Sequence, residues 1–167
     1  MRPEIIFLDG MTRLGSDHGF EAAADYLYDE GGPAPKWFIS ALSRGWPSIV
    51  IVSQLLGIGA PTAYLLRDDQ ENGCAARFLS GTSSGDGWAF CLFWKPHALV
   101  PEQFRVTEVI TSAFHEMAHA YVESCGREAP MGEEDTAEAF GCQCADGDYN
   151  GAIERLKSFV EQAAAEQ

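Results

Sequence analysis

The spacing of apolar residues in the first 45 positions predicts one strand and two helices. Residues 4–9 (EIIFLD) form a short apolar run that ends at Gly10, which favours a strand. Residues 19–30 (GFEAAADYLYDE) have the composition of a helix and are followed by Gly-Gly-Pro. Residues 35–45 (PKWFISALSRG) have a proline near the first turn and a glycine at the end, so we expect a second helix that ends at Gly45.

Four runs rich in β-branched and aromatic residues follow, and each predicts a strand. They are residues 48–56 (SIVIVSQLL), 62–68 (TAYLLRD), 74–80 (CAARFLS) and 88–94 (WAFCLFW). Residues 81–87 (GTSSGDG) join the last two runs and have the composition of an exposed hairpin turn. The middle of the chain is therefore expected to form a small twisted mixed β-sheet.

Helical periodicity dominates the last third of the chain. From residue 102 to 123 the apolar residues recur at spacings of three and four, which predicts a helix with one face on a core, and Gly126 follows as its end. A shorter helix is expected from about Gly132, carrying residues 133–144 (EEDTAEAFGCQC). An amphipathic helix is expected at residues 149–165 (YNGAIERLKSFVEQAAA).

The length favours one domain, because 167 residues can bury one sizeable core and are few for two. We expect an α+β domain over residues 1–167, with helices and sheet in 1–100 and three helices in 101–167. No apolar run reaches 18 residues, so no membrane span is expected. No apolar signal-peptide core follows Arg2, so secretion is not expected either. The five cysteines, an odd number, fit reduced thiols, and the expected location is the cytoplasm.

Charge is unevenly distributed along the chain. Residues 1–100 hold 11 acids and 7 bases, and residues 101–167 hold 14 acids and 4 bases, so the two parts carry −4 and −10 of the total −14. Nucleic acid is therefore not expected as a ligand, because phosphate contacts need a basic surface. The acidity is explained by a solvated surface, by attraction of basic partners or by mimicry of nucleic acid.

The candidate chemistry lies in residues 114–119 (FHEMAH). His115 and His119 stand four residues apart, so on a helix their rings share one face and two imidazole nitrogens can converge on one ion. Glu116 lies beside them, where a zinc hydrolase needs a carboxylate that accepts a proton from the attacking water and passes it to the leaving amine. The alternative is that this H-E-x-x-H spacing occurs by chance. Polar side chains on an otherwise apolar helix lose hydration, however, and coordination of a metal would offset that cost.

A third ligand is needed, because catalytic zinc usually has three protein ligands. Glu134 and Glu138 are one turn apart in the next expected helix. Glu134 is the candidate ligand, and Glu138 is the candidate acceptor for a ring N–H of a ligand histidine. The alternative for residues 133–135 is a favourable interaction of their acids with the helix macrodipole, which explains Glu138 poorly.

Together these motifs resemble the gluzincin branch of the zincin metallopeptidases, the thermolysin-like clan. That family pairs H-E-x-x-H with a second helix bearing E-x-x-[SA]-[DE]-x-F-[GA], and HEMAH and EDTAEAFG match over roughly residues 104–145. The resemblance implies a zincin-like fold and one Zn²⁺ held by His115, His119 and Glu134. Glu116 would be the general base and Glu138 the acid behind a histidine. His119 and Glu134 are separated by 14 residues, fewer than in larger gluzincins, and Glu138 stands where aspartate is usual.

The small size resembles minigluzincins or the ImmA/IrrE-type peptidases that cleave repressors. The resemblance therefore implies hydrolysis of peptide bonds in a peptide or protein substrate, with a regulatory protein as one candidate. It also implies an antiparallel edge strand to which an extended substrate adds, for which residues 87–95 (GWAFCLFWK) are the candidate. A cationic or phenolic group should stabilise the oxyanion, and Tyr149, His97 and Tyr121 are the candidates.

Three other hypotheses remain open from the sequence. Peptide deformylases pair H-E-x-x-H with an upstream cysteine, and NGCAA at Cys74 loosely resembles their motif. A zincin-fold protein could also bind a partner through its acidic surface without turnover, although an intact Glu116 argues against a dead enzyme. A structural zinc site at Cys142 and Cys144 has weak spacing support.

Overall fold

The computed structural model describes residues 3–8, 10–24, 32–69, 73–126 and 130–166, which form a mixed α and β fold. The strands are β1 (Ile5–Leu8), β2 (Met11–Leu14), β3 (Ala60–Leu66), β4 (Ala76–Phe78) and β5 (Gly87–Phe93). The helices are α1 (Phe20–Ala24), α2 (Lys36–Leu55), α3 (Trp94–Ala98), the 3₁₀ turn η1 (Glu102–Phe104), α4 (Arg105–Ser124), α5 (Glu133–Ala145) and α6 (Tyr149–Ala165). No described helix is long and apolar enough to cross a bilayer.

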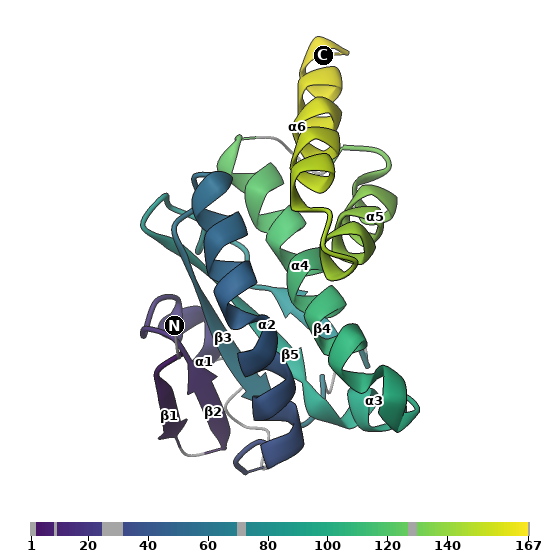
Figure 1. Ribbon diagram of the computed structural model, residues 1–167. Coiled ribbons are helices and arrows are strands. Elements are labelled where there is room, and N and C mark those ends of the chain that lie inside the picture. The colour runs from purple at the N-terminus through teal and green to yellow at the C-terminus, as the bar shows by residue number, and fades with distance from the viewer. Residues whose placement is uncertain (1–2, 9, 25–31, 70–72, 127–129, 167) are drawn as a thin grey trace.

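The five strands form one mixed sheet in the order β1-β2-β3-β5-β4. β3 and β5 are parallel, and the other neighbours are antiparallel. Helices α2 and α4 run side by side over one face of this sheet, and α5 and α6 pack beyond α4 (Figure 1). The fold therefore places the helix that carries both histidines directly on the sheet.

The alternation of side chains along the strands divides the core in two. Ala63 and Leu65 of β3 face the large core beneath α2 and α4. Tyr64 and Leu66 face a smaller cluster with Ala23 of α1. Because β3 is covered on both faces, nearly all its residues are apolar, as expected for an internal strand.

The strand expected at residues 48–56 is wrong, because α2 continues through this segment to Leu55. The β-branched side chains fit a helix here because Leu42, Ile49 and Val52 lie at helical spacing on the buried face. Gly45 is not a terminus. It lies at a close approach of two helices, where an added Cβ would be 2.7 Å from a side-chain carbon of Ile110 in α4.

Other expectations in the N-terminal half are met in part. The strands expected near the N-terminus and within 62–68, 74–80 and 88–94 form as β1, β3, β4 and β5, and the 81–87 loop joins an antiparallel hairpin. β2 and α3 were not anticipated. The helix expected at 19–30 forms over Phe20–Ala24, and residues 25–30 lie outside the described part of the chain.

The prediction that residues 87–95 form an edge strand is also wrong. Residues 87–93 form β5, which lies between β3 and β4 and is buried along its whole length. The edge position belongs to β4, the antiparallel strand before it in sequence. The three C-terminal helices form as expected, and α6 has the predicted bounds.

Candidate metal centre

Close packing of α5 on α4 brings the candidate metal ligands together. Gly141 of α5 lies against the backbone of α4, where an added Cβ would be 2.8 Å from the carbonyl oxygen of Thr111 and 3.3 Å from the amide nitrogen of His115. Phe140 and Phe114 pack edge to face beside this contact, with ring centroids 6.3 Å apart. The glycine thus allows the first half of α5 to project its carboxylates over His115.

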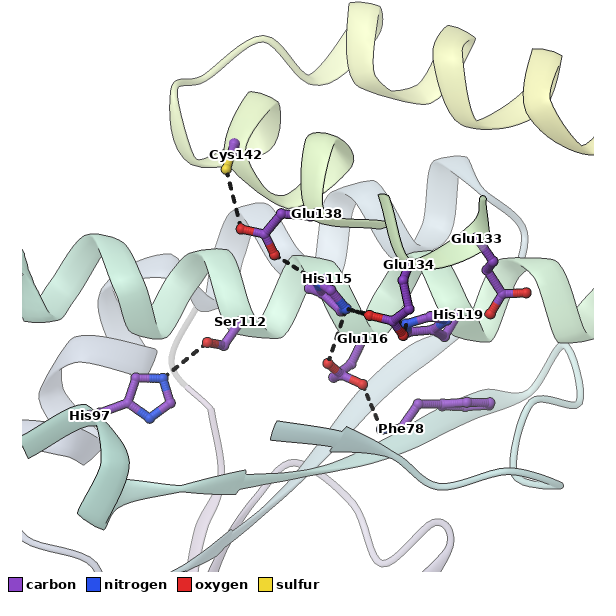
Figure 2. A network of polar contacts seen from close by, with 10 residues as sticks. All are labelled: Phe78, His97, Ser112, His115, Glu116, His119, Glu133, Glu134, Glu138 and Cys142. Atoms are coloured by element: carbon purple, nitrogen blue, oxygen red, sulfur yellow. Dashed lines mark hydrogen bonds and ion pairs between the residues drawn. The ribbon is translucent and has the colours of Figure 1, made fainter. Parts of the chain in front are cut away.

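His115, His119 and Glu134 converge on one point between α4 and α5 (Figure 2). The two Nε2 atoms are 3.3 Å apart. Oε2 of Glu134 is 3.1 Å from Nε2 of His115, and Oε1 of Glu134 is 2.8 Å from Nε2 of His119. These are the three residues predicted as metal ligands.

Both imidazoles are held from behind by carboxylates. Nδ1 of His115 donates to Oε2 of Glu138 at 2.9 Å, the contact expected from the sequence. Nδ1 of His119 donates to Oε2 of Glu133. A carboxylate behind each Nδ1 fixes the tautomer in which Nε2 carries a lone pair, and it raises the basicity of that nitrogen.

The donor set fits a metal ion. In the neutral tautomer with the proton on Nδ1, each ring presents an Nε2 lone pair, and these two lone pairs and the Glu134 carboxylate point at one another. A cation between them would satisfy all three acceptors. Zinc–nitrogen bonds of about 2.0–2.1 Å at tetrahedral angles separate two nitrogens by about 3.4 Å, close to the spacing of the two Nε2 atoms.

Glu116 is buried beside this cluster. One oxygen, Oε1, accepts the backbone N–H of Phe78 at 2.8 Å, and the other, Oε2, lies 4.0 Å from Nε2 of His115. Burial raises the pKa of the Glu116 carboxyl above its ordinary value, and the neighbouring histidines act in the opposite direction. The carboxylate thus has one anchored oxygen and one that faces the ligand cluster.

A groove runs along α4 past the cluster. It has two parts, of about 450 and 410 Å³, and both are lined by Cys74, Ala76, Glu116 and Glu134. His119 lines the first part and His115 the second. Because Cys74 and Ala76 belong to the edge strand β4 and its approach, the groove lies between the sheet edge and the candidate ligands.

None of the three candidate oxyanion stabilisers lines the groove, and two of them are hydrogen-bonded elsewhere. His97 is buried, with Nδ1 2.7 Å from the carbonyl oxygen of Phe93 and Nε2 3.0 Å from Oγ of Ser112. The Tyr149 hydroxyl donates to Oγ of Ser48 at 3.0 Å. Neither His97, Tyr149 nor Tyr121 lines either part of the groove. The described residues therefore supply no phenol at the site.

The cysteines also lie apart from the ligand cluster. Cys74 lines the groove, but the group of close ligand atoms consists of His115, His119 and Glu134 alone among the described residues. Cys142 is exposed and its thiol donates to Glu138 at 3.6 Å, whereas Cys144 is buried in the core. The two thiols of the C-x-C sequence therefore do not form a common site.

Two features of the site were missed from the sequence. Glu133 was assigned only to the helix macrodipole, although a residue adjacent to the ligand Glu134 could have been tested as a partner for His119. The backbone N–H of Phe78 has no sequence signal, because its position depends on how β4 packs against α4.

Comparison with known proteins gives no relative. None of the family models, curated proteins or solved structures compared with the chain matches it. The function must therefore be inferred from the residues and their geometry.

Proposed function

We propose that this protein is a zinc-dependent peptidase with a zincin-like arrangement of the gluzincin type. The observation that carries the proposal is the convergence of two Nε2 atoms and one carboxylate beside a buried glutamate, on the wall of a groove. His115, His119 and Glu134 would hold one zinc ion, and Glu138 and Glu133 would orient the two rings. When bound, zinc would polarise the scissile carbonyl and acidify the attacking water.

Glu116 is the proposed general base. Its free oxygen would accept the proton of the attacking water and then deliver it to the leaving amine. The other oxygen stays bonded to the Phe78 amide, so the carboxylate enters the reaction already oriented.

The edge of β4 is the proposed docking site for the substrate backbone. β4 pairs with β5 on one side only, and Ala76 and Cys74 on its approach line both parts of the groove. An extended peptide that added to this edge would lie between the sheet and α4, across Glu116.

We expect zinc-dependent cleavage of unstructured peptides. The zinc-loaded protein should cleave some members of a random, internally quenched peptide mixture. Chelation should abolish the cleavage and one equivalent of zinc should restore it. Without the metal ion, the attacking water is not acidified and the scissile carbonyl is not polarised, so proton transfer to Glu116 would not lead to cleavage. Mass spectrometry of the products identifies the bonds cut. A loaded, folded protein that cuts none of the peptides would contradict the proposal and favour a protein that binds without turnover.

The Phe78 amide gives a second prediction. Phe78→Pro removes the N–H bonded to Glu116 but no bond to β5, because this amide faces away from that strand and proline is tolerated at such edge positions. A hydrogen bond to a charged group is worth about 1.5–3 kcal/mol, so kcat should fall about 10- to 100-fold below that of Phe78→Ala. Phe78→Ala is the matched control, because it loses the same ring and keeps the amide. If Phe78→Pro and Phe78→Ala unfold at the same urea concentration and have equal kcat values, the Phe78 amide has no role in catalysis.

A further inference from the structure

The two parts of the groove differ in charge once the residues of the metal centre are set aside. The part beside His119, called here the His119 half, retains Arg77 and Glu123 as its charged lining. The part beside His115, called the His115 half, retains Glu108 alone. The remaining charges therefore cancel in the His119 half, whereas the His115 half keeps one negative charge.

In the His119 half, the acid is already used by the protein. Oε1 of Glu123 accepts the Ser80 hydroxyl at 2.7 Å and the Gly81 amide at 2.8 Å. Glu123 therefore ties the β4–β5 loop to α4 through Oε1, whereas its Oε2 is buried and has no hydrogen-bond partner among the described residues.

Glu108, in contrast, holds no other segment of the described chain in place. It is exposed on the first turns of α4 and forms no hydrogen bond or ion pair with any residue in the described ranges. The rest of the His115 half is lined by small side chains that leave room for a long one: Cys74, Ala75, Ala76, Thr111 and Ser112. A carboxylate without a hydrogen-bond partner in the described ranges thus stands at a wall of small residues.

The position of Glu108 matches the reach of a basic side chain. It precedes His115 by seven residues, which places it about 10 Å from the histidine along the helix axis. Lysine carries its charge at the end of a flexible four-carbon stem and arginine carries its charge on a fork of N–H donors, so either can place a cation well away from the peptide bond beside it. The charged end of a substrate lysine or arginine side chain would therefore lie near Glu108.

We propose that the His115 half selects a lysine or arginine side chain next to the scissile bond, with Glu108 as the specificity-determining residue. The inference rests on the proposed peptidase function. Glu138, also in this half, adds negative potential, although one of its oxygens is bonded to His115 and the other accepts from Cys142.

The experiment compares matched peptides on the zinc-loaded protein. Internally quenched peptides are N-acetylated and C-amidated, so that one central position carries the only charge, and that position is lysine, arginine, norleucine or glutamate. For wild type, kcat/KM should be about three- to tenfold higher with lysine or arginine than with norleucine, and this ratio should fall as salt is raised.

Variants of Glu108 assign the preference to its charge. Glu108→Gln should bring the lysine-to-norleucine ratio of kcat/KM close to one by lowering kcat/KM for the lysine peptide. Glu108→Lys should favour the glutamate peptide. Glu102→Gln is the matched control, because Glu102 is an exposed acid six residues earlier that does not line the groove, and it should keep the wild-type ratio.

The outcomes separate this inference from the proposed function. Cleavage with no preference for basic residues, or a preference that survives Glu108→Gln, would overturn the inference and leave the peptidase proposal intact. Failure to cleave any peptide with zinc bound would overturn both.

Discussion

Glu116→Gln should lower kcat by about 10²–10⁴-fold while the protein keeps its zinc and its fold. Glutamine preserves an oxygen that can accept the Phe78 amide, so the side chain stays anchored, but it cannot take a proton from the attacking water. The loss should appear in kcat rather than in KM, because the proposed docking site for the substrate backbone is β4 rather than Glu116. Peptide cleavage and metal content are measured on the same preparation.

Glu161→Gln is the control for this variant, since Glu161 is an exposed acid on α6 away from the groove, and it should have wild-type kcat. Full activity in Glu116→Gln would rule out the general-base mechanism even if zinc is bound.

Glu134→Ala should weaken zinc binding more than any other substitution of an acid in α5. Loss of a hydrogen-bonding partner behind a metal ligand typically lowers affinity about 10- to 100-fold, which is the effect expected for Glu138→Gln and Glu133→Gln. Glu134→Ala would remove a proposed ligand itself, so its effect should exceed that range. Zinc affinity is measured by competition with a fluorescent chelator, and thermal stabilisation by zinc should decrease in parallel.

Asp135→Ala distinguishes zinc coordination by Glu134 from a general effect of acids on the helix macrodipole. Asp135 is exposed, adjacent to Glu134 and in the same first turn of α5, so a macrodipole effect would make both variants equivalent. Coordination predicts wild-type affinity for Asp135→Ala. Equal losses in the two variants would contradict the assignment of Glu134 as a ligand.

The periodic helices were predictable because their signal is local. Apolar spacing indicated α4 and the amphipathic α6, and a helix was also expected from about Gly132, where α5 forms. Because α4 was predicted as a helix, His115 and His119, four residues apart, were expected to share one of its faces. The carboxylate behind His115 was also predictable, because Glu138 lies one turn after Glu134. These features depend on one helix or on two neighbouring ones.

The errors arise where distant segments decide the structure. Residues 48–56 have strand-like composition, yet they complete α2 because their buried face packs on the sheet and on α4. The edge position of β4 depends on the strand order β3-β5-β4, in which the chain returns to pair in parallel with β3. No local pattern in residues 87–93 reveals that both of their neighbouring positions are filled.

The central claim is that one zinc ion is held by two imidazoles and a carboxylate between α4 and α5. Zinc K-edge X-ray absorption on protein loaded with one equivalent tests it most directly. The account predicts a shell of nitrogen and oxygen only, at about 2.0–2.1 Å, with the scattering pattern of two imidazoles, and its loss in the His115→Ala/His119→Ala double variant. A sulfur shell at about 2.3 Å would instead assign a cysteine such as Cys74 as a ligand, and an unchanged spectrum in the double variant would place the metal elsewhere.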